Sequence, residues 1–272
     1  MTTSDFVGSL AKGLEVLQVF DREHPEMTLS EVAKATGISP AAARRCLLTL
    51  KELGFVTSHE RRFLLTPRVL RLSEAFLSSV SMQEVMQQFL QELADATGDS
   101  ASVGVLDGTD VLYIASVPVK RSYQVTPTIG TRYPAYATSL GRAILSRSPA
   151  EVVDEVLDAS PITALTAKTE TDPRRLRRAI ERATRAGIAG VEEELAYGVV
   201  SVAMPLLNGG GTAIAAVNCS TTPARTKLAD MVKSRREPLA KAHSQISAAL
   251  HQHPVLMHSV LGSGGGLRPA RE

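Results

Sequence analysis

The feature that most constrains the fold is a pair of short predicted helices separated only by "GIS". The first helix begins at Thr28, with Glu31 three positions further on as in a capping box, and stops at Gly37. The second has Ser39 as its N-cap and Pro40 in the first helical position. Because a glycine permits the sharp bend between them, the sequence predicts a helix-turn-helix.

The flanking segments predict a winged form of this motif. Upstream, "SLAKGLEVLQVF" has the spacing of an amphipathic helix, with an apolar stripe of Leu10, Leu14, Leu17 and either Val16 or Phe20. Downstream, "KELG" ends the second helix at Gly54. Two β-prone stretches, 55–57 and 63–65, then flank the polar tip "HERR", which predicts a small hairpin, or wing.

The helical period divides the second helix into two faces. Ala43, Cys46 or Leu47, Leu50 and Leu53 are predicted to face inward, with Arg44 and Arg45 on the other side. Small residues at its start let the positive helix end approach phosphate, and arginine can read guanine bidentately. Residues 44–71 carry seven basic and two acidic side chains, a local net charge of +5. We therefore expect a DNA-binding surface, formed by Thr28, Ser39, Ala41, Ala42, Arg44, Arg45, Thr49, Arg61 and Arg62.

Two alternatives stay open at this stage. The arginines could contact base edges or only phosphates. The winged helix could also bind protein, within a ligand-sensing module or an enzyme. Enzyme readings are weak, because no GxSxG, HExxH, Walker A or dinucleotide-binding pattern is present, and no cofactor is expected.

The rest of the chain predicts an α+β fold. "TPRVLRLSEAFLSSV" reads as an apolar helix, and residues 100–252 alternate strands with helices. Strands meet around Asp107–Gly108 and across "NGGG", and a long helix is expected from about 227 to 250. The basic segment "DPRRLRRAIERATRAG" is interpreted as a helix with a buried apolar stripe and a solvated arginine face.

Composition limits the remaining classes. The net charge of +2 is nearly neutral, so any nucleic-acid surface must be local. Two cysteines far apart in sequence argue against a zinc site or a disulfide framework, and no metal is expected. No signal peptide or long apolar run is present, which favours a cytoplasmic protein without a membrane span.

The order of these elements, followed by "IGTRYPAYATSLGRAIL" and "GVEEELAYGVVSVAMP", resembles the IclR family of bacterial transcriptional regulators. The likeness covers about residues 6–250. It is closest to the branch that controls aromatic-acid catabolism, the regulators of the protocatechuate/β-ketoadipate and 4-hydroxybenzoate pathways.

The resemblance implies a winged helix-turn-helix domain (1–66), a linker helix (67–81), a GAF-like effector-binding and oligomerisation domain (82–252) and a disordered tail (253–272). It implies a homodimer or homotetramer on double-stranded operator DNA, with a small aromatic or dicarboxylic acid as effector. Carried over by motif, the effector residues are Tyr136, Ser139, Glu193, Ser201, Asn218 and Ser220.

One position departs from the family pattern. The family commonly has "GLRS" where this chain reads "GVVS", so Val200 stands in place of an arginine. An anionic effector would still favour a nearby cation, for which Arg121 and Arg132 are the candidates.

Overall fold

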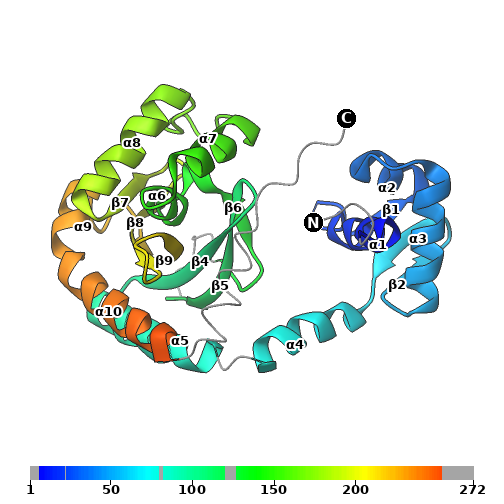
Figure 1. Cartoon of the computed structure of the whole chain (residues 1–272), viewed down its shortest axis with the longest axis horizontal. Coiled ribbons are helices and arrows are strands. Elements are labelled where there is room, and N and C mark those ends of the chain that lie inside the picture. The colour runs from blue at the N-terminus through cyan, green and yellow to red at the C-terminus, as the bar shows by residue number, and fades with distance from the viewer. Residues whose placement is uncertain (1–5, 22, 80–81, 120–126, 253–272) are drawn as a thin grey trace. The chain divides into compact units, whose positions relative to one another are not determined.

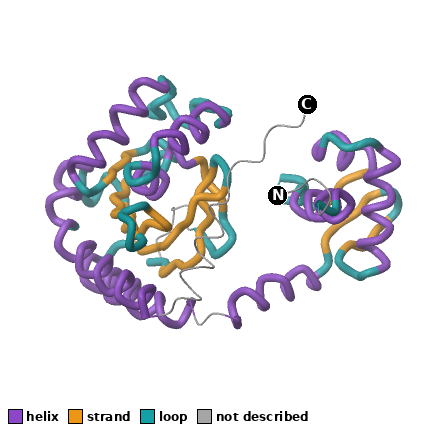
Figure 2. The backbone as a smooth tube through the Cα atoms, viewed as in Figure 1, coloured by secondary structure: helices purple, strands orange, loops and turns teal. Residues whose placement is uncertain are grey.

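A computed structural model describes residues 6–21, 23–79, 82–119 and 127–252, with the backbone alone described at 75–79 and 82–85 (Figures 1 and 2). The chain forms two compact units, Met1–Ser79 and Val80–Glu272. Within the described ranges, no helix combines the length and the apolar character needed to cross a membrane.

The first unit is a winged helix. Its elements are α1 (Gly8–Gln18), β1 (Glu26–Thr28), α2 (Leu29–Thr36), α3 (Pro40–Glu52), β2 (Val56–His59), β3 (Arg62–Leu65), a 3₁₀ turn (Pro67–Val69) and α4 (Leu70–Ser79). The predicted caps are confirmed. Thr28 and Glu31 form a complete capping box, Gly37 is left-handed with φ 66°, and Ser39 accepts a hydrogen bond from the amide of Ala42.

The wing has one strand more than the sequence predicts. β2 and β3 form the expected hairpin, and β1 adds to the other side of β3 in an antiparallel sheet of order β1-β3-β2. "HPEMTL" therefore does more than interrupt two helices. Its extended residues form backbone hydrogen bonds with the edge of β3 that β2 does not cover. This pairing joins segments far apart in the chain, so the local sequence does not predict it.

The core of this unit lies between α1, α2, α3 and β2. Val16, Val32 and Leu47 are fully buried there. Three leucines expected to face inward are exposed instead: Leu10 by 62%, Leu14 by 44% and Leu53 by 51%. The helix α1 packs on α3 through the side that carries Ala11 and Val16. The sequence did not reveal this side, since the helical period alone does not select between adjacent apolar stripes.

The second unit is an α+β domain. Its elements are α5 (Met82–Thr97), β4 (Ser100–Asp107), β5 (Asp110–Val117), β6 (Arg132–Pro134), a 3₁₀ turn (Ala135–Ala137), α6 (Ser139–Leu145), α7 (Ala150–Ala159), α8 (Pro173–Ala186), β7 (Ala189–Glu192), β8 (Val200–Leu207), β9 (Ala213–Thr221), α9 (Leu228–Ser234) and α10 (Arg236–Gln252). The six strands form one antiparallel sheet of order β6-β5-β4-β9-β8-β7.

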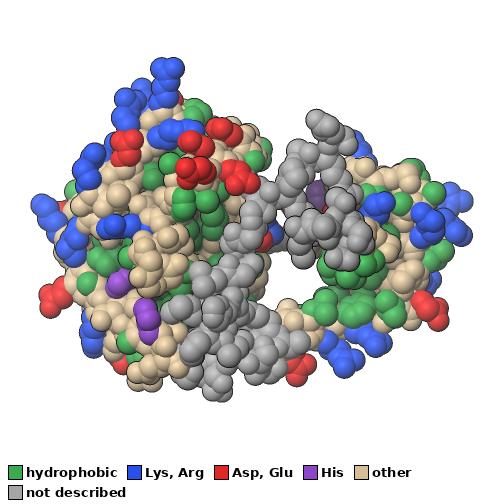
Figure 3. Space-filling view, viewed as in Figure 1, with side chains coloured by type: hydrophobic (Ala, Val, Ile, Leu, Met, Phe, Trp, Pro, Cys, Tyr) green, Lys and Arg blue, Asp and Glu red, His purple; other side chains and the backbone are tan. Residues whose placement is uncertain are grey.

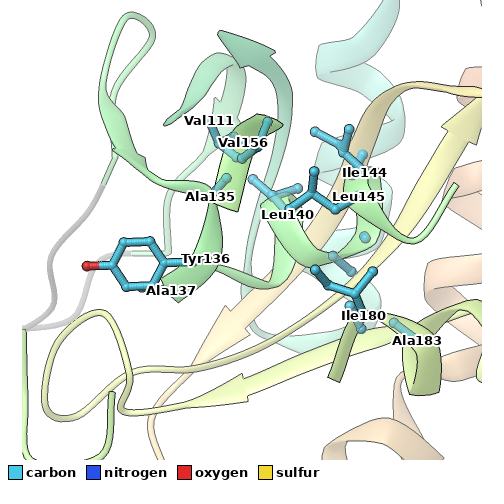
Figure 4. Close-up of a cluster of buried hydrophobic side chains, with 14 of the residues drawn as sticks. Val111, Ala135, Tyr136, Ala137, Leu140, Ile144, Leu145, Val156, Ile180 and Ala183 are labelled. Atoms are coloured by element: carbon cyan, nitrogen blue, oxygen red, sulfur yellow. The ribbon is translucent and has the colours of Figure 1, made fainter. Parts of the chain in front are cut away.

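Helices cover both faces of this sheet. α6 packs on β4, β8 and β9, with α8 behind it, whereas α5 and α10 pack on the sheet as an adjacent pair (Figure 1). The buried cluster under α6 includes Leu140, Ile144 and Ile180 (Figure 4). At Gly141 a Cβ atom would lie 2.2 Å from the carbonyl oxygen of Ala135, so only glycine lets α6 approach the preceding turn this closely.

The long final helix expected from about 227 to 250 is two helices, which meet at Arg235. The break coincides with a buried ion-pair network. Asp99, which is fully buried, accepts hydrogen bonds from Arg235 Nε at 2.8 Å and from Arg225 at 3.1 Å. This network ties the α5–β4 turn to the segments before α9 and α10, a long-range contact that helical periodicity does not reveal.

Candidate DNA-binding and effector-binding sites

The exposed face of α3 carries the two arginines that raised the question of DNA binding. Arg44, Arg45 and Ala41 are exposed, whereas Ala42 is buried at 7% exposure and faces α1 rather than the solvent. Close approach of the helix end to a phosphate therefore depends on Ala41. The hydroxyls of Thr28 and Ser39 both accept amide hydrogen bonds as N-caps, so these two residues fix the helix starts.

The two arginines of the wing differ from each other. Arg61 is exposed in the turn, next to Glu60, whose φ of 53° is left-handed. Arg62 donates to the carbonyl oxygen of Glu26 at 3.2 Å and lies 3.4 Å and 3.6 Å from the carboxylates of Glu26 and Glu31. Arg62 thus holds the wing against β1 and α2, while Arg61 is available to a partner.

An apolar groove lies beside the exposed face of α3. It has a volume of about 730 Å³ and runs between α1 and α3. The exposed leucines named above, with Leu72 of α4, form most of its apolar wall, and Arg45 and Thr49 stand on its α3 side. Figure 3 shows hydrophobic side chains gathered on the visible face of the first unit. A surface of this kind marks an interaction site more often than a solvated face.

In the second unit, a narrow pocket opens between β8, β9 and the start of α6. Its walls combine hydroxyl and amide groups with apolar side chains: Tyr113, Pro127, Tyr133, Ala137, Thr138, Val191, Leu195, Val199, Ser201, Asn218 and Ser220. Ser201, Asn218 and Ser220 share one face of paired strands, as alternation predicts. Ser201 Oγ donates to Ser139 Oγ at 2.9 Å, which places Ser139 directly behind the wall.

Asn218 gives this pocket an unmet hydrogen-bonding requirement. Its Oδ1 is buried and has no hydrogen-bond partner in the part of the chain that the structure describes. Buried polar side-chain atoms are nearly always paired, so this oxygen is suited to a donor from a bound molecule. Opposite it, Tyr113 and Tyr133 stack edge to face at 5.7 Å, and burial raises the pKa of both phenols.

Two other predicted effector residues, Arg132 and Tyr136, lie outside this pocket. Arg132 pairs with Asp107 and Asp110, so it braces the β4–β5 turn. The Tyr136 hydroxyl hydrogen-bonds with the backbone of Thr163, and its ring is buried in the core (Figure 4). Arg121 falls outside the described residues.

Glu193 anchors the loop between β7 and β8 and does not line the pocket. Its backbone is left-handed, with φ 59°, and its carboxylate accepts hydrogen bonds from the amide of Gly198 and from Lys168. The hydrogen bond from the Lys168 ammonium lowers the pKa of the Glu193 carboxyl and raises the pKa of Lys168. The same loop is fixed to α6 by Glu194, which binds Arg142 bidentately at 2.7 and 2.5 Å.

Among the residues that the structure describes, none of those that line the pocket is charged. Val200 is fully buried and follows the pocket residue Val199 and precedes Ser201, so its side chain lies on the opposite face of β8. Valine at this position therefore takes no cation away from the pocket wall. Sequence reasoning missed Tyr113, Tyr133 and Leu195, because the pocket joins segments that are far apart in the chain and carry no common motif.

Comparison with known proteins identifies the family to which both units belong. Residues 74–248 match the family described as "Bacterial transcriptional regulator IclR C-terminal", and residues 9–60 match the IclR helix-turn-helix domain. The chain belongs to the IclR family. It is therefore a transcriptional regulator and not an enzyme, and the interpretation of the winged helix as part of an enzyme is not favoured.

Individual relatives cover most of the chain. The Pca regulon regulatory protein of Pseudomonas putida is 36% identical over 242 residues, 89% of this chain and 83% of that protein. The p-hydroxybenzoate hydroxylase transcriptional activator of Acinetobacter baylyi is 37% identical over 235 residues, 83% of this chain and 85% of that protein. A crystal structure of a protein from Rhodococcus sp. RHA1, described as a transcriptional regulator, has 43% identity and a TM-score of 0.73 and covers 91% of this chain and 99% of its own.

Proposed function

We propose that this regulator controls an operon for the catabolism of an aromatic acid and responds to a small aromatic acid bound in the pocket of its second unit. The observation that carries the proposal is the pocket around Asn218, with an orphan oxygen, several hydroxyls and two tyrosine rings. The relatives named for the Pca regulon and for p-hydroxybenzoate hydroxylase support the same ligand class. Since operator DNA is in the cytoplasm of a bacterium, we place the protein there.

The pocket favours a hydroxylated benzoate. The apolar side chains Val191, Leu195 and Val199 suit a ring, and the terminal amide of Asn218 can accept a hydrogen bond from a phenolic hydroxyl. The hydroxyl of Ser220 can donate to a carboxylate without a cation, and the hydroxyl of Ser201 can do so by turning its proton from Ser139 to the ligand. This arrangement distinguishes 4-hydroxybenzoate and protocatechuate from β-ketoadipate, which has no ring.

Ligand entry must move the walls of the pocket. Its cavity volume is about 30 Å³, far below the few hundred Å³ that a drug-sized ligand occupies. Its walls include Thr138, the N-cap of α6, and the loop 193–199, and the buried pair of Arg142 and Glu194 joins α6 to this loop. Displacement of these elements is the step through which we expect the effector to change the regulator.

For DNA, we infer that Arg44 and Arg45 of α3 face the major groove and that Arg61 of the wing contacts a phosphate or the minor groove. Arg62, with its carboxylate partners, positions the wing. The groove lined by Leu10, Leu14 and Leu53 is the surface on which we expect a second copy to dock, giving a dimer. A symmetric dimer of this motif reads two half-sites about 34 Å apart.

A mobility-shift titration with DNA from upstream of the regulator's own gene tests the DNA interface. Arg44→Gln and Arg45→Gln should each weaken binding about tenfold or more, in line with the 1–3 kcal/mol of one bidentate base contact. Arg62→Gln removes the same charge and serves as the control, with a smaller effect expected. Equal losses for all three variants would contradict the assignment of base contacts to α3.

Calorimetric titration tests the effector. The wild-type protein should bind 4-hydroxybenzoate or protocatechuate at least about tenfold more tightly than benzoate, because benzoate lacks the phenolic hydroxyl that would donate a hydrogen bond to Asn218. Ser201→Leu should abolish this binding and leave operator affinity intact. If none of these acids bind, or if benzoate binds as tightly, the aromatic-acid assignment fails while the DNA assignment stands.

A further inference from the structure

The arginine-rich helix α8 borders a second cavity in the effector unit. The cavity has a volume of about 330 Å³ and lies against α6 and the β7–β8 loop. All of its lining residues but one are charged: Arg142, Glu170, Arg175, Arg178, Ala179, Arg182 and Glu194. The sequence led us to interpret the α8 arginines as a solvated face, and the tertiary structure places three of them around one concavity.

The floor of this cleft is a closed ion pair. Arg142 is 5% exposed, donates to both carboxylate oxygens of Glu194 and uses its Nε on the carbonyl oxygen of Tyr136. Glu194 also accepts a hydrogen bond from the amide of Glu170, and Glu170 accepts one from the amide of Asp172. The two acids of the cleft are therefore already occupied by protein donors.

The cations at the rim differ in their pairing, because Arg175 lies 3.9 Å from a carboxylate oxygen of Glu170 and 3.8 Å from one of Asp172. Arg178 and Arg182 are one helical turn apart on α8, and neither pairs with a carboxylate among the described residues. Arg177, on the neighbouring face of the same helix, binds Asp154 at 2.7 Å and approaches Asp158 at 3.6 Å. Like charges one turn apart destabilise a helix, so Arg178 and Arg182 repel each other on the cleft side of α8. A bound anion between them would remove this repulsion.

Four arginines and two glutamates give the cleft a net charge of +2. Its only uncharged lining residue is Ala179, whose small side chain leaves the space between the arginines open. Apart from Ala179, the described side chains of the cleft are all charged, in contrast with the pocket at Asn218. Guanidinium groups at this spacing suit a ligand with several anionic oxygens.

We propose that this cleft is a second ligand site, which binds a small molecule carrying two or more anionic groups, held by Arg178 and Arg182 with Arg175 at the rim. A polycarboxylate and a phosphate ester share this chemistry. The site is distinct from the aromatic-acid pocket, but the β7–β8 loop contributes residues to both, and α6 contributes Arg142 to the cleft and its N-cap Thr138 to the pocket. A bound polyanion thereby acts on the loop that an aromatic effector must move.

Calorimetric titration of the full-length protein with citrate and with pyrophosphate, at constant ionic strength, tests the proposal and separates the two ligand sources. At least one probe should bind with sub-millimolar affinity, and acetate should not. The double variant Arg178→Gln/Arg182→Gln should weaken that binding at least about tenfold. Arg174→Gln/Arg185→Gln removes the same charge from exposed residues of α8 that do not line the cleft, and should change the affinity less than about twofold.

Three results would overturn the proposal: no binding of either probe, equal losses in the two double variants, or a changed oligomeric state in sedimentation without a change in binding. The last outcome would assign the cleft to a contact between copies. Tyrosine fluorescence verifies that each variant is folded. Because the aromatic-acid titrations use a different pocket, their failure would leave this result unaffected.

Discussion

Removal of the Glu194 carboxylate is the perturbation that best tests how the effector unit holds together. Glu194 accepts two hydrogen bonds from Arg142 and one from the amide of Glu170. The two side chains of the pair are only 6% and 13% exposed, so Glu194→Ala leaves a buried guanidinium without its counter-charge. We expect the free energy of unfolding to fall by about 3 kcal/mol, the lower end of the range for breaking a buried pair, because the open cleft admits water to Arg142.

A double-mutant cycle separates this interaction from other effects. Arg142→Met removes the cation but also leaves the carbonyl oxygen of Tyr136 without its donor, a loss that the double variant shares. Arg142→Met/Glu194→Ala should therefore be more stable than the sum of the single losses predicts, by a coupling energy of about 2 kcal/mol.

The assay is urea unfolding of the full chain followed by tyrosine fluorescence. The chain has five tyrosines and no tryptophan, and every tyrosine lies beyond residue 80, so the signal reports on the effector unit alone. A coupling energy below about 0.5 kcal/mol would refute the reasoning, because it would mean that the pair is solvated and gives the loop no support.

Three further predictions concern other buried groups. Burial lowers the pKa of His243, whose ring also contacts the carbonyl oxygen of Pro205 at 3.0 Å. As the pH falls below about 6.5, the unfolded state binds a proton at this histidine before the folded state does, so the free energy of unfolding decreases. Urea unfolding at several pH values should show a smaller decrease for His243→Gln than for the wild type. Cys219 is fully buried and burial raises its pKa, whereas Cys46 is partly exposed. The thiol of Cys46 should therefore react quickly with Ellman's reagent, and that of Cys219 only after unfolding. Two fast-reacting thiols would contradict the packing of β9. Gly141→Ala should lower the free energy of unfolding by about 1–3 kcal/mol, because its Cβ would overlap the carbonyl oxygen of Ala135, and an unchanged urea midpoint would show that α6 can shift freely.

Local sequence signals predicted the local structure well. The caps at Thr28 and Ser39 and the left-handed glycine Gly37 depend on hydrogen bonds and backbone angles within a few residues. The helix-turn-helix, the wing hairpin and the alternating face of β9 are all confirmed for this reason. Strand β1 was not predicted, because its partner β3 lies more than thirty residues away along the chain.

Side-chain partners were the part that sequence could not supply. Arg132 and Arg62 are cations in suitable motifs, yet both pair with carboxylates brought near by the sheet register or by α2. Leu10 and Leu53 have the spacing of core residues, yet they line an open groove. Periodicity predicts which residues share a face of a helix or strand, but only the tertiary packing decides whether that face contacts the core, another segment or solvent.

The sequence by itself therefore determined the family, the two-unit order of elements and an arginine-bearing recognition helix, since motif and period act over short distances. The tertiary structure decided which arginines pair with carboxylates, that the described residues lining the effector pocket are uncharged, and that the α8 arginines surround a cleft. Those properties depend on burial and on charge pairing between segments far apart in the chain. Arg177 and Arg178 are neighbours in sequence but lie on different faces of α8, and only Arg177 has Asp154 of α7 within reach among the described residues.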